Sequence, residues 1–126
     1  MSAFVYDAAV LVAADRNDRR IWADHKALLE DGNVPLVPAG VVGQASRSIR
    51  QVQLRRFLRG CIVVALDEST AHAAGLLLGK AGATDVVDAS VVTLAVSRRA
   101  VIVTGDPDDI ERLVAASGIH LPVVGP

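Results

Sequence analysis

Aspartates stand where predicted strands end. Asp7 directly follows the apolar segment at residues 3–6, and Asp106 follows residues 100–104 after a single glycine. Asp88 lies near the start of a predicted helix that leads into the second of these strands. Binding sites of open parallel sheets form beyond the carboxyl ends of the strands. We therefore expect these carboxylates to meet at one edge of one sheet.

Carboxylates gathered in this way repel one another and raise each other's pKa values, and a divalent cation relieves that repulsion. Hard oxygen ligands suit Mg²⁺ or Mn²⁺. Zinc is disfavoured because the sequence offers one cysteine, Cys61, and three scattered histidines, His25, His72 and His120. The pattern predicts a magnesium or manganese site.

Each acid also has an ordinary structural explanation. Asp106 before Pro107 is typical of a helix N-cap with proline in the first turn, and Asp7 can cap the helix that follows it. Asp85, three residues before Asp88, fits a capping arrangement. If all the acids only cap helices, the chain is an α/β domain that has no reason to bind a cation.

Apolar strands alternate with helical segments along the whole chain. Strands are predicted at residues 3–6, 34–38, 61–66, 100–104 and 121–124, and helices at 8–14, 18–30, 39–60 with a break near 46–48, 69–80, 86–98 and 106–116. Such an alternation predicts a short, mostly parallel sheet covered on both faces, with the last strand at an edge. The expected fold class is a three-layer α/β/α sandwich.

Composition narrows the class of protein. The 126 residues are 52% hydrophobic and only 3% aromatic, with a mean hydropathy of +0.40, which predicts one domain, residues 1–126, with an aliphatic core and excludes intrinsic disorder. The longest apolar run, residues 8–14, is far shorter than the roughly 18 residues of a membrane span. The lone cysteine and the lack of a cationic leader favour a cytoplasmic protein without contact to a membrane.

The net charge of −1 hides a basic segment. Residues 44–60 contain no acid and five arginines: Arg47, Arg50, Arg55, Arg56 and Arg59. One interpretation is a track for a phosphate backbone, with Arg47 and Arg50 beside the acidic pocket. The alternative is a solvated helix face or an interface paired with acids from elsewhere. In either case the apolar residues between the arginines are expected on the buried side: Ile49, Val52, Leu54, Phe57 and Leu58.

Three segments together resemble a PIN domain. These are Val-Tyr-Asp-Ala-Ala-Val-Leu at residues 5–11, Asp-Val-Val-Asp-Ala at 85–89 and Val-Thr-Gly-Asp-Pro-Asp-Asp at 103–109. Their order and spacing, and the length of the chain, are similar to VapC-type toxins of bacterial VapBC toxin–antitoxin systems. The resemblance implies a PIN-like fold and a Mg²⁺-dependent endoribonuclease that acts on RNA.

The resemblance also implies roles for individual residues and partners. Asp7, Asp88 and Asp106 would hold the metal, directly or through water, with Asp85 as an auxiliary acid and Thr104 as a supporting group. The metal would activate water and stabilise charge on the scissile phosphate. A homodimer is expected, together with a small cognate antitoxin that blocks the metal site.

One position departs from the family pattern. The second acid of PIN domains is a glutamate on the helix after the second strand, and Gln44 stands there in this chain. No acid occurs between Gly32 and Leu66, so a shifted alignment does not supply one. Three core carboxylates remain, enough for one Mg²⁺ that keeps several waters. The alternative is a catalytically impaired module that binds RNA or an antitoxin-like partner.

Overall fold

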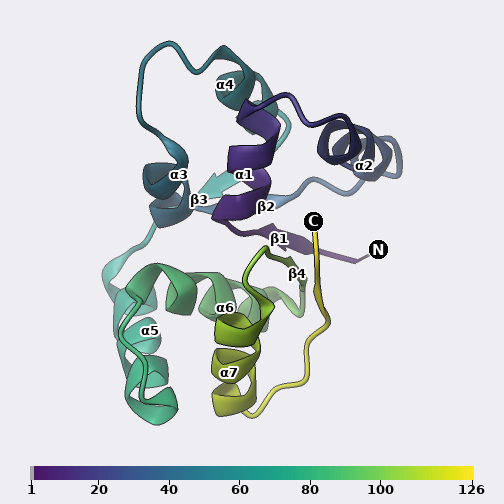
Figure 1. The fold of residues 1–126 in the computed structure, drawn as a ribbon. Coiled ribbons are helices and arrows are strands. Elements are labelled where there is room, and N and C mark those ends of the chain that lie inside the picture. Colours follow the sequence, from purple (N-terminus) through teal and green to yellow (C-terminus); the bar gives the residue numbers. More distant parts are fainter. Residues whose placement is uncertain (1) are drawn as a thin grey trace.

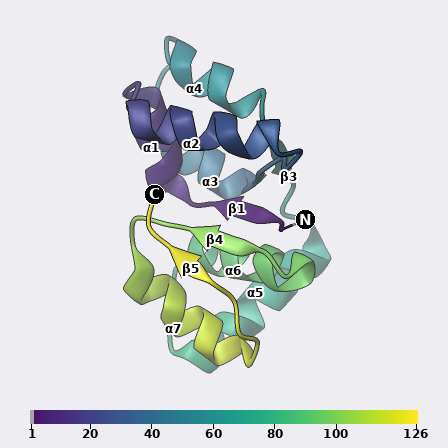
Figure 2. The same cartoon turned by 90° about the vertical axis from the view of Figure 1, so that its right-hand side faces the viewer.

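The computed structural model describes residues 2–126 and contains a five-stranded sheet in the order β3-β2-β1-β4-β5, in which every pairing is parallel (Figure 1). The strands are β1 (Phe4–Tyr6), β2 (Leu36–Pro38), β3 (Ile62–Val64), β4 (Val101–Val103) and β5 (Val123–Val124). Helices α1 (Ala8–Asp15), α2 (Arg19–Glu30), α3 (Ala39–Ala45) and α4 (Val52–Leu58) lie on one side of the sheet. Helices α5 (Glu68–Ala81), α6 (Val86–Arg98) and α7 (Pro107–Ser117) lie on the other side (Figure 2). The predicted three-layer sandwich is confirmed.

The register of the central strands brings the segments at residues 5–11 and 103–109 together. Tyr6 of β1 pairs with Val103 of β4, and the backbone N–H of Asp7 donates to the carbonyl of Val103 at 2.9 Å. Asp7 and Thr104 therefore lie side by side at the carboxyl edge of the sheet. This adjacency follows from parallel pairing of β1 with β4, which are far apart in sequence.

The predicted elements are confirmed with shifted ends. Helix α6 has the predicted bounds, whereas each strand is shorter than its apolar segment. The predicted helix at 39–60 is interrupted over residues 46–51, a longer break than expected, because Ser46 adopts an extended backbone (φ −82°, ψ 128°) that ends α3. The arginine segment is thus divided between a loop and a short helix.

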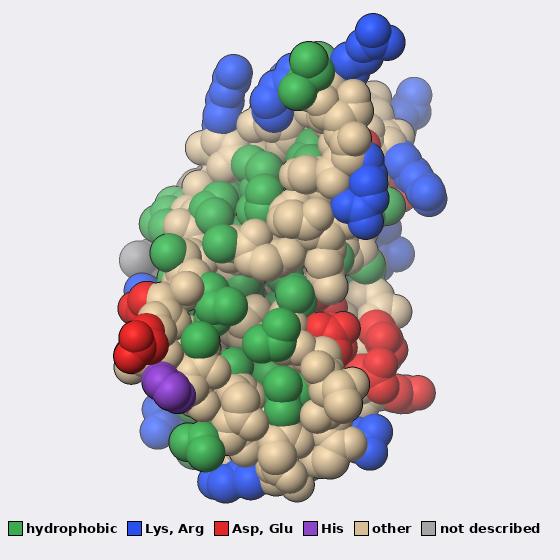
Figure 3. All heavy atoms as spheres, turned by 90° about the vertical axis from the view of Figure 1, so that its left-hand side faces the viewer, with side chains coloured by type: hydrophobic (Ala, Val, Ile, Leu, Met, Phe, Trp, Pro, Cys, Tyr) green, Lys and Arg blue, Asp and Glu red, His purple; other side chains and the backbone are tan. Residues whose placement is uncertain are grey.

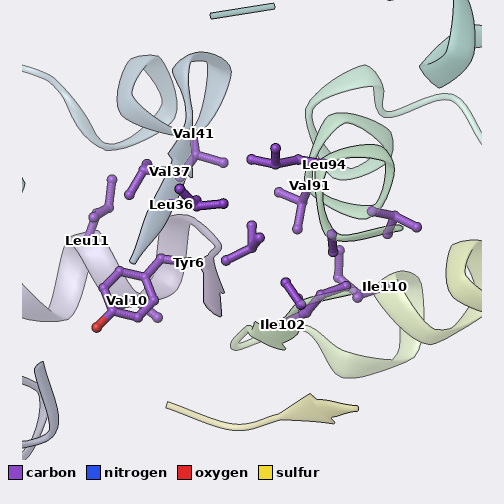
Figure 4. Close-up of a cluster of buried hydrophobic side chains, with 14 of the residues drawn as sticks. Tyr6, Val10, Leu11, Leu36, Val37, Val41, Val91, Leu94, Ile102 and Ile110 are labelled. Carbon is purple, nitrogen blue, oxygen red and sulfur yellow. The ribbon is translucent and has the colours of Figure 1, made fainter. Parts of the chain in front are cut away.

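An aliphatic core fills the space between the sheet and the helices. Val5 and Ile102 on the central strands and Val91 on α6 are fully buried. Figure 4 shows Val91 and Leu94 of α6 directed towards Val41 of α3. This packing joins the two helical layers and fixes where α6, and with it Asp88, begins.

An aromatic cluster attaches α4 to the rest of the fold. Phe57 is fully buried, with its ring centroid 4.0 Å from that of His25 on α2 and 5.1 Å from that of Trp22. Tyr6 Oη and His25 Nδ1 are hydrogen-bonded at 3.0 Å. Phe57 is therefore a core anchor, as expected, and Trp22 is half-buried beside it.

The predicted buried side of the arginine segment is wrong at two positions. Leu54 is buried, but Ile49 is 90% exposed and Val52 is 53% exposed. Ile49 lies in the break between α3 and α4, where helical periodicity no longer applies. Separately, no helix within residues 2–126 is long and apolar enough to cross a membrane.

Candidate active site at the carboxyl edge of the sheet

Asp7 is held at the N-terminus of α1 by two hydrogen bonds. Its side chain is 6% exposed, its Oδ1 accepts from the backbone N–H of Ala8 at 2.7 Å, and its Oδ2 accepts from Thr104 Oγ1 at 2.7 Å. The predicted cap is thus present, but it uses only one of the two oxygens. The second oxygen joins β1 to the end of β4, which a cap alone does not require.

Thr104 links Asp7 to the turn that carries Asp106. The hydroxyl of this fully buried residue donates to Asp7 and accepts from the backbone N–H of Asp106 at 3.0 Å. The turn lies against α1 so closely that a Cβ on Gly105 would come within 2.6 Å of the Ala9 Cβ. A glycine is therefore required between the threonine and the aspartate.

Asp106 does not cap α7 as its position before Pro107 predicts. It occupies the N-cap position, but its side chain makes no capping hydrogen bond, and its backbone (φ −130°, ψ 69°) differs from the usual extended cap geometry. A side-chain hydrogen bond with Asp109 is the main cause that raises the pKa of Asp106, followed by desolvation and the charges of Asp109, Asp108 and Asp7. The carboxylate is exposed and faces other acids.

Asp88, in the first turn of α6, has its pKa raised by the same group of acids. Partial burial is the main cause that raises its pKa to about 6, and the charges of Asp85, Asp7, Asp106 and Asp109 raise it further. The structure therefore brings the three predicted ligands, Asp7, Asp88 and Asp106, within electrostatic reach of one another. At neutral pH their mutual repulsion favours a bound cation.

Asp85 has a structural role, as the capping pattern indicated. It is the N-cap of α6, and its Oδ1 accepts from the backbone N–H of Val87 at 2.9 Å and of Asp88 at 3.0 Å. An open cavity of about 220 Å³ lies between the start of α6 and α7, lined by Asp85, Asp88, Asp109 and Arg112 among others. An auxiliary role for Asp85 in this cavity stays a prediction.

Sequence reasoning missed Asp109 and Arg112. Both follow Asp106 on α7 at intervals of three residues, which places them one turn apart on one face of the helix. Asp109 was named from the sequence only as the last residue of the segment at 103–109. The i, i+3 spacing was the signal that could have found both residues.

The remaining predicted residues lie on α3 and in the loop after it. Gln44 is half-buried on α3 and is absent from the lining of the cavity beside Asp88. Arg47 donates from Nη1 to the carbonyls of Gly43 and Ser46 at 3.2 and 2.7 Å. Arg50 is exposed.

The candidate ligands fit a Mg²⁺ ion in their chemistry but not in their spacing. Carboxylate oxygens are the hard ligands that Mg²⁺ prefers, and a cation stabilises acids that raise each other's pKa values. Within the described part of the chain, however, no three side chains of His, Cys, Asp or Glu are grouped closely enough to hold a metal ion. Asp7, Asp88 and Asp106 would have to draw together around the ion.

Comparisons with known proteins give similarity in structure and none in sequence. No family model and no curated protein sequence matches the chain. A chain of VapBC2 from Rickettsia felis, solved bound to a DNA fragment from its promoter, is similar with a TM-score of 0.73 and 15% identity over 98% of both chains. A chain of FitAB, solved bound to the IR36 DNA fragment, is similar with a TM-score of 0.68 and 16% identity over 98% of this chain and 94% of the other. At these identities the likeness concerns the fold alone, and the chain has the three-layer α/β/α fold of these two structures.

Proposed function

We propose that the protein is a Mg²⁺- or Mn²⁺-dependent endoribonuclease, the toxin component of a type II toxin–antitoxin system. The observation that carries this proposal is the hydrogen-bonded unit Asp7–Thr104–Asp106 at the carboxyl edge of β1 and β4. The charges of Asp7 and Asp106 also raise the pKa of the nearby Asp88. A set of helix caps needs neither a buried threonine between two acids nor a carboxylate with a raised pKa. The proposed metal ligands are Asp7, Asp88 and Asp106.

The residues of the chain have distinct tasks in this proposal. The backbone N–H of Ala8 and the hydroxyl of Thr104 fix both oxygens of Asp7, so one ligand is oriented before the ion arrives. Asp88 and Asp106 lose their mutual repulsion when a cation is present. The bound ion would supply activation of water and stabilisation of charge on the scissile phosphate.

The partners are proposed from the same comparison. VapBC2 and FitAB were both solved as complexes with a DNA fragment. We infer a small cognate antitoxin that covers the acidic edge, RNA as the substrate and a homodimer as the state of the toxin.

A catalytically impaired binding module is the second candidate. Two observations favour it: glutamine stands at position 44, and the acids are not gathered into a closed ligand group in the described residues. This candidate shares metal binding and RNA binding with the first, and differs from it in turnover.

Calorimetric titration of the protein with Mn²⁺ and Mg²⁺ tests the metal site independently of any RNA target. Asp7→Asn should abolish binding because it removes the oriented charge. Asp31→Asn, which removes an exposed carboxylate from the turn after α2, is the matched control and should bind as the natural protein does. Equal binding by Asp7→Asn and the control would refute the assignment of Asp7. Gln44→Glu, on α3, should tighten the binding of Mn²⁺ and Mg²⁺, and unchanged affinity would show that Gln44 does not face the site.

A further inference from the structure

We propose that residues 46–51, here called the arginine loop, form a preorganised binding surface for the phosphodiester backbone of single-stranded RNA, with Gln51 as its positioning residue. The proposal rests on the proposed ribonuclease function and names a surface that receives the strand on the same face as the acidic site. It adds a residue, Gln51, that carries no charge and makes no predicted contact with substrate.

Gln51 holds the arginine loop with four hydrogen bonds from one side chain. Its Oε1 accepts from the backbone N–H of Arg47 at 2.6 Å and of Ser48 at 2.9 Å. Its Nε2 donates to the carbonyl of Ala45 at 2.9 Å and to Asp15 Oδ2, at the end of α1, at 3.0 Å. The loop is thereby tied to both α3 and α1, which positions a segment that has no regular structure of its own.

Two arginine side chains of this region, those of Arg47 and Arg55, are oriented by backbone carbonyls. Arg47 donates to the carbonyls of Gly43 and Ser46, and Arg55 donates to that of Ile49. Within residues 2–126 the contacts between basic side chains and carboxylates are Lys26–Glu30 and His72–Glu68, so none of the five arginines between residues 44 and 60 is paired with a carboxylate. Guanidinium groups held in this way keep donors available for phosphate oxygens.

Ile49 gives the surface an apolar element. It is 90% exposed between arginines, and it borders an open groove of about 780 Å³ that is lined by Val42, Leu54 and Leu58 as well as Arg47. An isoleucine so fully in water contributes almost nothing to the core of this chain. It is placed to contact a nucleobase while the arginines contact the adjoining phosphates.

The basic and acidic surfaces share one side of the molecule. Figure 3 shows Lys and Arg side chains gathered at the end of the molecule that α4 forms, with a group of acidic side chains lower on the same face. A strand bound through its phosphates to the arginine loop could extend towards the acidic edge. An acidic protein segment is the competing occupant of such a surface.

Fluorescence anisotropy of a labelled single-stranded RNA, measured with the metal-free protein in EDTA, tests the proposal without cleavage. Arg50→Gln should weaken binding roughly fivefold at low salt and make the salt dependence shallower by about 0.7 in slope, the value for one lost phosphate contact. Gln51→Leu should weaken binding to a similar extent although it changes no charge, because the loop is no longer held.

Two matched controls separate positioning from general effects. Gln53→Leu makes the same change two residues further on, where the side chain accepts only from Arg56, and Arg98→Gln removes an arginine from the last turn of α6 at the opposite edge of the sheet. Both controls should bind RNA as the natural protein does. Thermal unfolding of each variant checks the fold, and Arg50→Gln carries the test if Gln51→Leu does not fold.

Each outcome decides one part of the proposal. Unchanged affinity in both Arg50→Gln and Gln51→Leu would overturn the assignment of the arginine loop and leave the ribonuclease proposal standing. No RNA binding by the natural protein would overturn both. Displacement of the RNA by poly-glutamate at equal charge concentration would overturn the RNA assignment and identify an acidic protein segment as the occupant.

Discussion

At the scale of single residues, the site depends on one hydroxyl. Thr104 is fully buried and satisfies both Asp7 Oδ2 and the backbone N–H of Asp106. Thr104→Val keeps the shape but leaves both groups unpaired, so the free energy of unfolding should fall by about 1–3 kcal/mol. Thr104→Ser retains the hydroxyl and should lose less. Urea unfolding of the three proteins at neutral pH measures the difference, and equal losses in the two variants would contradict this role.

The raised pKa of Asp88 makes the stability of the folded protein decrease as pH rises. Its pKa is raised from the ordinary 3.8 to about 6, so between these values the folded protein keeps a proton that the unfolded chain has released. Stability from this residue is therefore greatest near pH 4, falls as pH rises to about 6 and is level above it. Asp88→Asn should raise the melting temperature at pH 7.5 and have no such benefit near pH 4.

Melting curves at these two pH values test the prediction, with Asp31→Asn as the control. A stabilisation by Asp88→Asn that is the same at both pH values would show that repulsion among the acids is not its cause. The same residue bears on metal binding. Affinity for Mg²⁺ should rise as pH increases through about 6, because the ion binds the ionised carboxylate.

At the scale of elements, the close approach of α1 to the turn between β4 and α7 sets the geometry of the site. Gly105→Ala would place a Cβ 2.6 Å from the Ala9 Cβ, and neither backbone can yield without moving Asp7 or Asp106. We expect a loss of about 1–3 kcal/mol in stability and weaker metal binding. The double variant Gly105→Ala with Ala9→Gly removes the overlap and should recover most of both. Absence of recovery, measured by unfolding and calorimetry, would contradict this explanation.

The sequence predicted elements with strong periodicity and missed those that depend on distant partners. Helix α6 begins at its predicted residue because Asp85 caps it locally. The break at residues 46–51 was underestimated because Gln51 stabilises it through Asp15, which is 36 positions away. Ile49 and Val52 were assigned to a buried side because helical periodicity was extended through that break.

At the scale of the whole molecule, the sheet order brings the acidic motifs together. Asp7 and Asp106 were predictable as neighbours because parallel strands end at a common edge, and β1 does pair with β4. The i, i+3 spacing of Asp106 and Asp109 was visible in the sequence. The hydrogen bond from Thr104 to Asp7 was not predictable, since it depends on side-chain placement after folding. The cap at Asp106 failed for the same reason: its side chain interacts with Asp109 rather than with the helix backbone.

Two charged surfaces follow from this arrangement, one acidic at the sheet edge and one basic around α4. In the proposed function the basic surface contacts phosphates of the substrate and the acidic surface holds a divalent cation. The proposed ribonuclease and the impaired module that Gln44 suggests differ in whether the acidic surface is a catalyst or only a binding site. Turnover, rather than binding, separates these outcomes.

The most direct test is cleavage of RNA by the purified natural protein in Mg²⁺, in Mn²⁺ and in EDTA, beside Asp7→Asn and Gln44→Glu. The proposed function predicts cleavage with either metal, none in EDTA, and none above background for Asp7→Asn that unfolds as cooperatively as the natural protein. Cleavage by Gln44→Glu alone would identify the binding module instead. Cleavage that persists in EDTA, or that Asp7→Asn leaves undiminished, would contradict a metal-dependent ribonuclease built on Asp7, Asp88 and Asp106.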